Sequence, residues 1–222
     1  MLAAGATPMI TFAEETLALL LDDKTGTFLP IGKYALEHAL VGGILMDLAF
    51  ADRIDTDPEQ LIIIDASPTG NPMLDRVLKR ISESSETRDT AAWLEIISEE
   101  QGESIQEQAI ESLIERGVLE RREEKFLWVF RSRRYPMMDG KIQREARQRV
   151  VGVLFSGDIP DPRDIALICI ADACGVLKTV FGDKELDEVS PRLDQLRKMD
   201  LIGRELITQL SVWRWSGTIT RI

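Results

Sequence analysis

The stretch Leu36-Glu-His-Ala-Leu-Val-Gly-Gly-Ile-Leu-Met-Asp-Leu-Ala-Phe-Ala51 decides the fold. Its apolar residues recur at helical spacing and cover most of the helix circumference, which predicts a central helix surrounded by others. Gly42 and Gly43 lack side chains, so we expect a neighbouring helix to approach closely there. Asp47 interrupts the run, which is too short to cross a bilayer.

Helical periodicity continues on both sides of this stretch. Thr11-Phe-Ala-Glu14 has the spacing of a capping box and predicts a helix that ends at the turn Asp22–Gly26. Further helices are expected at residues 73–81, 93–97, 105–114, 141–155, about 164–177, 185–198 and 201–215. Two short β-hairpins are expected at residues 53–64 and 118–130, the second with its turn in the charged stretch 121–125.

These elements predict a mainly α protein with a single globular domain over residues 1–222. A central helix bundle is expected to be wrapped by amphipathic helices, with two short β-hairpins and a flexible lead at residues 1–10. The hydrophobic fraction of 44% excludes intrinsic disorder as the main state. The two cysteines, Cys169 and Cys174, lie in an apolar helix, which excludes a disulfide framework and favours the cytoplasm.

Residue patterns typical of catalysis are scarce. His38 is the only histidine, and its place in the most apolar helix indicates an interior residue rather than a general base. The turn Ser67-Pro-Thr-Gly70 precedes a helix, but a single glycine without a nearby lysine favours a helix cap over a phosphate site. We therefore expect a protein that is not an enzyme and has no cofactor and no metal.

Charge is distributed unevenly along the chain. The formal net charge is −11, yet residues 121–149 contain ten Lys/Arg and four Asp/Glu, a local +6 that leaves −17 elsewhere. This asymmetry predicts one anion-facing surface on an acidic body. The candidate anion-binding residues are Arg121, Arg122, Arg131, Arg133, Arg134, Arg144 and Arg147, and Arg149 is expected on the same exposed helix face.

The same region contains the apolar segment Phe126, Leu127, Trp128, Val129 and Phe130. An apolar hairpin ringed by arginines suits the boundary between lipid headgroups and acyl chains. A protein client or a second copy of the chain would use the same ingredients, and a half-buried hairpin with solvated arginines also remains open. A winged-helix DNA-binding domain is the third alternative. The acidic stripe at Glu103, Glu107, Glu111 and Glu115 would repel phosphates, so no nucleic-acid partner is expected.

Several segments together resemble the Golgi phosphoprotein 3 family, in the family's order from about Thr11 to Phe181. The segments are Leu17-Ala-Leu-Leu-Leu-Asp-Asp-Lys-Thr-Gly26, Ala39–Ala49 with Arg53-Ile54, Pro68-Thr-Gly70 with Leu74-Asp75, Leu113–Leu119, Phe126–Phe130, Arg134-Tyr-Pro136 with the Arg144–Arg149 helix, and Asp161-Pro-Arg163. No single motif is specific, but the ordered set is. The lack of a basic N-terminal tail points to a bacterial-type member.

The resemblance implies a peripheral membrane adaptor on the cytosolic face. Eukaryotic members bind phosphatidylinositol 4-phosphate, and their hairpin serves in membrane contact and self-association. Their lipid pocket uses a tryptophan, an arginine and two basic residues three apart. These positions align with Gly32, Val41, Glu103 and Gln106, none of which retains the required chemistry. The expected partner is therefore an anionic membrane lipid, with a phosphoinositide among the candidates, bound outside that pocket, and protein clients and a second copy are the alternatives.

Overall fold

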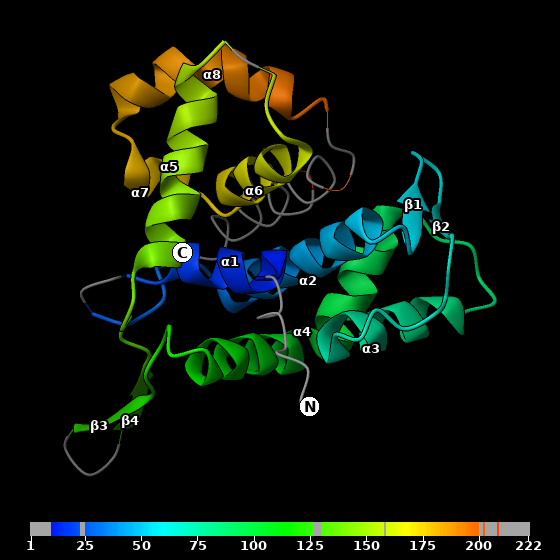
Figure 1. Ribbon diagram of the computed structural model, residues 1–222, viewed down its shortest axis with the longest axis horizontal. Helices are drawn as coiled ribbons and strands as arrows, with labels where there is room; N and C mark the ends of the chain where they lie inside the picture. Colours follow the sequence, from blue (N-terminus) through cyan, green and yellow to red (C-terminus); the bar gives the residue numbers. More distant parts are fainter. Residues whose placement is uncertain are drawn as a thin grey trace, which may run out of the picture.

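The computed structural model describes residues 10–22, 25–126, 130–157, 159–199, 202 and 208, with the backbone alone at residues 123–126, 130–133, 179 and 180. The described residues form helices and two short antiparallel hairpins (Figure 1). The helices are α1 (Phe12–Leu20), α2 (Lys33–Phe50), α3 (Pro72–Ser82), α4 (Thr90–Glu115), α5 (Lys141–Phe155), α6 (Pro162–Ala173), α7 (Leu177–Val180) and α8 (Asp183–Leu196). The strands are β1 (Ile54–Thr56), β2 (Leu61–Ile63), β3 (Arg122–Phe126) and β4 (Phe130–Arg134). The expected mainly α fold with two hairpins is confirmed.

Helices α1 and α2 lie in the middle of the molecule, with α3 and α4 on one side and α5 to α8 on the other (Figure 1). One continuous hydrophobic core joins all these helices. Every residue of α1 is buried, although the helix has only nine residues. A helix this short is marginal by itself, so its stability comes from packing on all sides.

Close backbone approach explains the glycine at position 43. A Cβ added to Gly43 would lie 2.9 Å from the backbone nitrogen of Ala13 and 3.0 Å from the carbonyl carbon of Phe12. The backbones of α1 and α2 therefore touch, as the sequence predicts for this pair of glycines.

The two helices expected at residues 93–97 and 105–114 are wrong as separate elements, because α4 runs unbroken from Thr90 to Glu115. Gly102 lies in its middle, where an added Cβ would be 2.8 Å from the Cβ of Glu37 on α2. The glycine thus serves the contact between α2 and α4 and does not end the helix. The capping box at Thr11 and Glu14 is confirmed.

The turn expected at residues 121–125 is also wrong. These residues belong mostly to β3, which pairs with β4 in the register Arg122 to Arg134 through Phe126 to Phe130. The hairpin projects from the helical body, so β3 lacks the alternating apolar residues of a strand packed on a core, and its charged sequence resembles that of a turn. The connection between the strands runs through Leu127, Trp128 and Val129, which lie outside the described residues, as does nearly all of the helix expected at 201–215.

Candidate functional site

The first turn of α1 carries two buried glutamates. Glu14 Oε2 accepts hydrogen bonds from the backbone nitrogen of Thr11 at 2.7 Å and from its hydroxyl at 3.0 Å. Glu14 Oε1 accepts a hydrogen bond from Ser112 and lies 3.4 Å from Nε of Arg116, at the end of α4. One carboxylate thus closes the helix end and ties it to α4.

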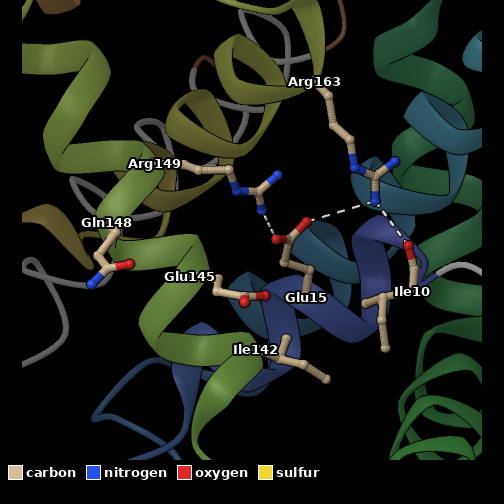
Figure 2. A pocket seen from close by; sticks show the side chains of 7 residues that line it. All are labelled: Ile10, Glu15, Ile142, Glu145, Gln148, Arg149 and Arg163. Atoms are coloured by element: carbon tan, nitrogen blue, oxygen red, sulfur yellow. Dashed lines mark hydrogen bonds and ion pairs between the residues drawn. The ribbon is translucent and has the colours of Figure 1, made fainter.

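Glu15 points to the opposite side, between α5 and α6 (Figure 2). Its Oε1 pairs with Nη2 of Arg149, and its Oε2 lies 3.6 Å from Nη2 of Arg163. The other terminal nitrogen of Arg149 lies 3.4 Å from Asp164. The Glu15 side chain is only 7% exposed, so two guanidiniums offset a charge that would be costly to bury alone.

Arg163 joins this pair to the start of α1. Its Nη2 donates a hydrogen bond of 2.9 Å to the carbonyl oxygen of Ile10, and its guanidinium lies 3.9 Å from the ring centre of Phe12. Its Nη1 lies 3.6 Å from Asp47 on α2. Asp47 in turn accepts a 2.7 Å hydrogen bond from the backbone nitrogen of Phe12.

These seven side chains are called the α1 charge cluster below: Glu14, Glu15, Asp47, Asp164, Arg116, Arg149 and Arg163. Burial raises the pKa of Asp47 to about 7, and the Phe12 N–H and the Arg163 guanidinium only partly oppose this shift. Burial likewise raises the pKa of Asp164, against the lowering effect of Arg149. Desolvation therefore outweighs ion pairing at both carboxyl groups.

A cavity of about 580 Å³ opens beside Glu15, between α1, α5 and α6 (Figure 2). Its lining residues are Ile10, Glu15, Ile142, Glu145, Gln148, Arg149 and Arg163. A second cavity of about 730 Å³ lies on the other side of Arg163 and Ile10 and is also lined by Asp47. The start of α1 is thus a common wall of two cavities.

The hairpin β3–β4 projects away from the helical body (Figure 1). Its root is anchored: the backbone nitrogen of Tyr135 donates a 2.7 Å hydrogen bond to the carbonyl of Gly26, in the connection between α1 and α2. Gly26 has a φ of +66°, and a Cβ there would lie 2.5 Å from the nitrogen of Pro136. Only glycine fits this contact.

Most of the candidate arginines whose side chains are described are paired with acids. Arg121 lies 2.6 Å from Glu111, Arg122 lies 2.8 Å from Glu120, and Arg144 lies 3.7 Å from Asp139. The expectation that Arg149 lies on an exposed basic face is wrong, because its guanidinium pairs with buried Glu15. Glu15, Glu111 and Glu120 lie outside residues 121–149 and partly offset the net +6 of that segment, whereas Asp139 is already included in the count.

For the remaining candidate residues of the hairpin and of α5, the structure describes some side chains and not others. Arg134 and Arg147 are half-buried, and Arg147 has no acid within ion-pair distance in the described part of the chain. The side chains of Arg131, Arg133, Phe126 and Phe130 are not described. Leu127, Trp128 and Val129 lie outside the described residues, so the apolar segment is placed only by the strands that flank it.

The positions aligned with the family's lipid pocket lie near the start of α2 and on α4. Gly32 is exposed at the N-terminal end of α2, and Val41 is fully buried. Glu103 is 72% exposed and bonds to Lys33, next to Gly32, at 2.9 Å. Gln106 is half-buried on α4. A lysine–glutamate pair thus stands where the resemblance implies cations for a phosphate.

His38 is an interior residue, as the sequence predicts. Its side chain is 1% exposed and stacks on Tyr34, with ring centres 3.8 Å apart. Its ring nitrogens lie 3.0 Å from the carbonyl oxygen of Tyr34 and 3.2 Å from Glu95. Both nitrogens have partners within the fold, which is the arrangement of a structural histidine.

The loop at Ser67–Gly70 is a helix cap. Asp75 accepts hydrogen bonds from the backbone nitrogens of Thr69 at 2.6 Å and Gly70 at 3.2 Å. The donors that would hold a phosphate are therefore already used by a side chain of α3.

The α1 charge cluster is not evident from the sequence alone. Three carboxylates, Glu14, Glu15 and Asp47, interrupt otherwise apolar helices, and acids at such positions are the available signal. Within the described ranges, no group of three or more His, Cys, Asp or Glu side chains has metal-binding geometry. No helix in the described part of the chain is long and apolar enough to cross a membrane.

These features define a mainly helical protein built around a buried first helix, with a basic hairpin projecting from one end. The chain belongs to the Golgi phosphoprotein 3 (GPP34) family, whose model matches residues 12–210. A curated relative is the vacuolar protein sorting-associated protein 74 of Eremothecium gossypii, which is 28% identical over 215 residues. The alignment covers 82% of this chain and 64% of the relative, so the chain spans less than two thirds of the relative's length.

Proposed function

We propose that this protein is a non-enzymatic adaptor that associates peripherally with anionic membranes through the β3–β4 hairpin. Membership of the Golgi phosphoprotein 3 family supports the adaptor role, and a relative named for vacuolar protein sorting supports a role in sorting other proteins. The family match gives no reason to expect catalysis.

The observation that carries the proposal is the register of the hairpin. Phe126 pairs with Phe130 at the end of the described ladder farthest from the root, and Lys125 pairs directly with Arg131 next to them. Like charges directly opposite each other on adjacent strands are destabilising. An anionic surface would remove that repulsion while the apolar segment enters the headgroup boundary.

The ion pairs at the hairpin root reduce the set of residues that can bind an anionic surface. Arg121 and Arg122 are held by Glu111 and Glu120, so they contribute little net field. Lys125 and Arg131 lie farther along the strands, next to the apolar segment, whereas Arg133 lies opposite Glu123. We propose that Lys125 and Arg131, rather than the root arginines, contact lipid phosphates or carboxylates.

The residues at the positions aligned with the family's lipid pocket bear on which class of lipid this chain binds. The Lys33–Glu103 pair at the family's headgroup position lacks the bidentate cations that a 4-phosphate requires. We therefore propose a general preference for anionic lipids and no dedicated phosphatidylinositol 4-phosphate site at Gly32, Val41, Glu103 and Gln106.

Co-sedimentation with vesicles tests the proposal. The full chain is mixed with phosphatidylcholine vesicles and with vesicles that also contain phosphatidylserine, at about 0.05 M and 0.5 M salt. We expect binding to the anionic vesicles only, and weaker binding at the higher salt. The double variant Lys125→Gln/Arg131→Gln should bind about thirtyfold more weakly, since each cation near the surface contributes about 1 kcal/mol.

A matched control removes the same charge elsewhere. Lys184 and Lys198 are exposed and make no ion pair within the described residues, so Lys184→Gln/Lys198→Gln should leave vesicle binding nearly unchanged. Equal binding to neutral and anionic vesicles, or equal losses in both double variants, would overturn the proposal. Loss of self-association in Trp128→Asp, measured by sizing, without any vesicle binding by the parent chain would favour a homo-oligomerising hairpin instead.

A further inference from the structure

The α1 charge cluster contains four carboxylates and three guanidiniums. Glu14 and Glu15 come from α1, Asp47 from α2 and Asp164 from α6, and the cations come from the end of α4, from α5 and from α6. Exposed Asp161 adds a further negative charge near Asp164. If every group is ionised, the cluster carries at least one unbalanced negative charge in a largely buried place.

We assign the unbalanced negative charge of the cluster to Asp47. Glu14 is met by Arg116 and Ser112, and Glu15 is met by two arginines. Among the described residues, the cation paired with Asp47 is Arg163, at 3.6 Å, and the negative charge of Glu14 also acts on Asp47 and raises its pKa. Arg163 is shared with Glu15, and its hydrogen bond goes to Ile10. The Asp47 side chain is 11% exposed, so water offsets little of its charge.

Asp47 also holds the start of α1. It accepts the Phe12 N–H, which has no partner within its own helix turn, and the Arg163 that faces it holds the Ile10 carbonyl. Any change in the charge of Asp47 therefore acts on the two contacts that fix residues 10–12 against α2 and α6.

We propose that Asp47 is the proton-accepting group of a latch at the N-terminal end of α1. The latch consists of the contacts that residues 10–12 make with Asp47 and Arg163. With a proton on Asp47 the cluster is balanced and the latch is closed. Without it the surplus charge favours a state in which residues 10–12 separate from α2 and α6 and water reaches the carboxylate. Because Ile10 and Arg163 line both the 580 Å³ and the 730 Å³ cavities, opening would join them.

The sign of the pH dependence follows from linkage. The raised pKa of Asp47, about 7, means that the closed state binds a proton more tightly than the open state, in which the carboxyl would titrate near about 4. Closure is therefore favoured at acidic pH. Opening becomes easier as the pH rises from about 4 to about 7 and levels off above that range.

Hydrogen exchange with mass spectrometry tests the latch on the full chain. Exchange of the peptide covering residues 10–20 is compared with that of an α8 peptide between pH 5 and 8, which removes the intrinsic pH dependence of exchange. We expect the relative opening of the α1 peptide to rise by up to about tenfold per pH unit below pH 7 and then to level off. Asp47→Asn should abolish this rise, because the amide does not titrate.

The control variant is Asp172→Asn, which removes another carboxylate that is largely buried and paired with an arginine, Arg197. It should retain the pH-dependent opening of α1. If Asp47→Asn does not fold, carbon NMR titration of the Asp47 carboxyl in the parent chain decides the question. A pH-independent α1 peptide, the same rise in Asp47→Asn, or an Asp47 carboxyl that titrates near about 4 would each overturn the proposal. None of these outcomes depends on vesicle binding.

Discussion

The α1 charge cluster and the root of the β3–β4 hairpin are built from the same residue types but differ in burial. Glu15 is 7% exposed and is held by two arginines from two helices. Glu111, at the hairpin root, is 51% exposed and is held by Arg121, which is 40% exposed. Water screens the second pair and not the first, so equal ion pairs have unequal consequences. A count of arginines cannot distinguish the two regions.

The largest expected effect comes from removing the buried carboxylate. Glu15→Gln keeps the shape but removes the buried anion that Arg149 and Arg163 share, which leaves them the remaining pairs with Asp164 and Asp47. We expect the free energy of unfolding to fall by about 2–4 kcal/mol, measured by urea denaturation. Glu111→Gln should lower it by less than about 1 kcal/mol. Similar losses in the two variants would remove the distinction between the regions.

A smaller loss of unfolding free energy is expected where an uncharged side chain contacts buried α1. It tests whether the burial of α1, rather than the charge of its partners, determines how much stability a substitution removes. Gln143 on α5 is buried and donates hydrogen bonds to the carbonyl oxygens of Ala18 at 2.8 Å and Leu21 at 2.7 Å. Gln143→Leu should lower the free energy of unfolding by about 1–3 kcal/mol, because it leaves these carbonyls without their donor. The exposed Gln148→Leu on the same helix is the control and should change it by less than about 0.5 kcal/mol. A neutral Gln143→Leu would contradict this interpretation.

The smallest effect is expected at the hairpin root. Arg121→Gln/Arg122→Gln breaks two exposed ion pairs and should change the urea midpoint by the equivalent of less than about 1 kcal/mol. Vesicle binding by this variant should fall less than in Lys125→Gln/Arg131→Gln, since the root arginines are already paired. A greater loss of binding at the root would reassign the anion-facing surface to Arg121 and Arg122.

The sequence predicts those helices whose apolar residues repeat at helical spacing within one continuous segment. Helix α2 is recognisable because its apolar residues repeat over 18 positions, and α5 matches the expected bounds of 141–155. The polar stretch 98–104 misleads because it interrupts the apolar repeat of α4, although Gly102 within it packs against Glu37 of another helix. The charged strand β3 misleads because it pairs with β4 in a hairpin that projects from the helical body, so it lacks the apolar alternation of a core-facing strand. Local pattern therefore predicts the type of most elements, whereas contacts between elements decide the continuity of a helix.

The charge cluster was beyond the reach of local patterns for the same reason. Glu15 and Asp47 look like interruptions of apolar helices, and their partner Arg163 lies more than a hundred residues later in the chain. Arg149 was counted with an exposed basic face because helical spacing does not say which neighbour a half-buried side chain meets. An acid within an apolar helix is the signal that such a partner exists.

The contact between Gly26 and Pro136 fixes where the hairpin leaves the helical body. Its root is bonded to the connection between α1 and α2 through the Tyr135 N–H and the Gly26 carbonyl. The residue at position 26 therefore sets the spacing between the hairpin root and the segment that follows α1, a helix in which every residue is buried. A side chain larger than that of glycine at this position would push the two segments apart.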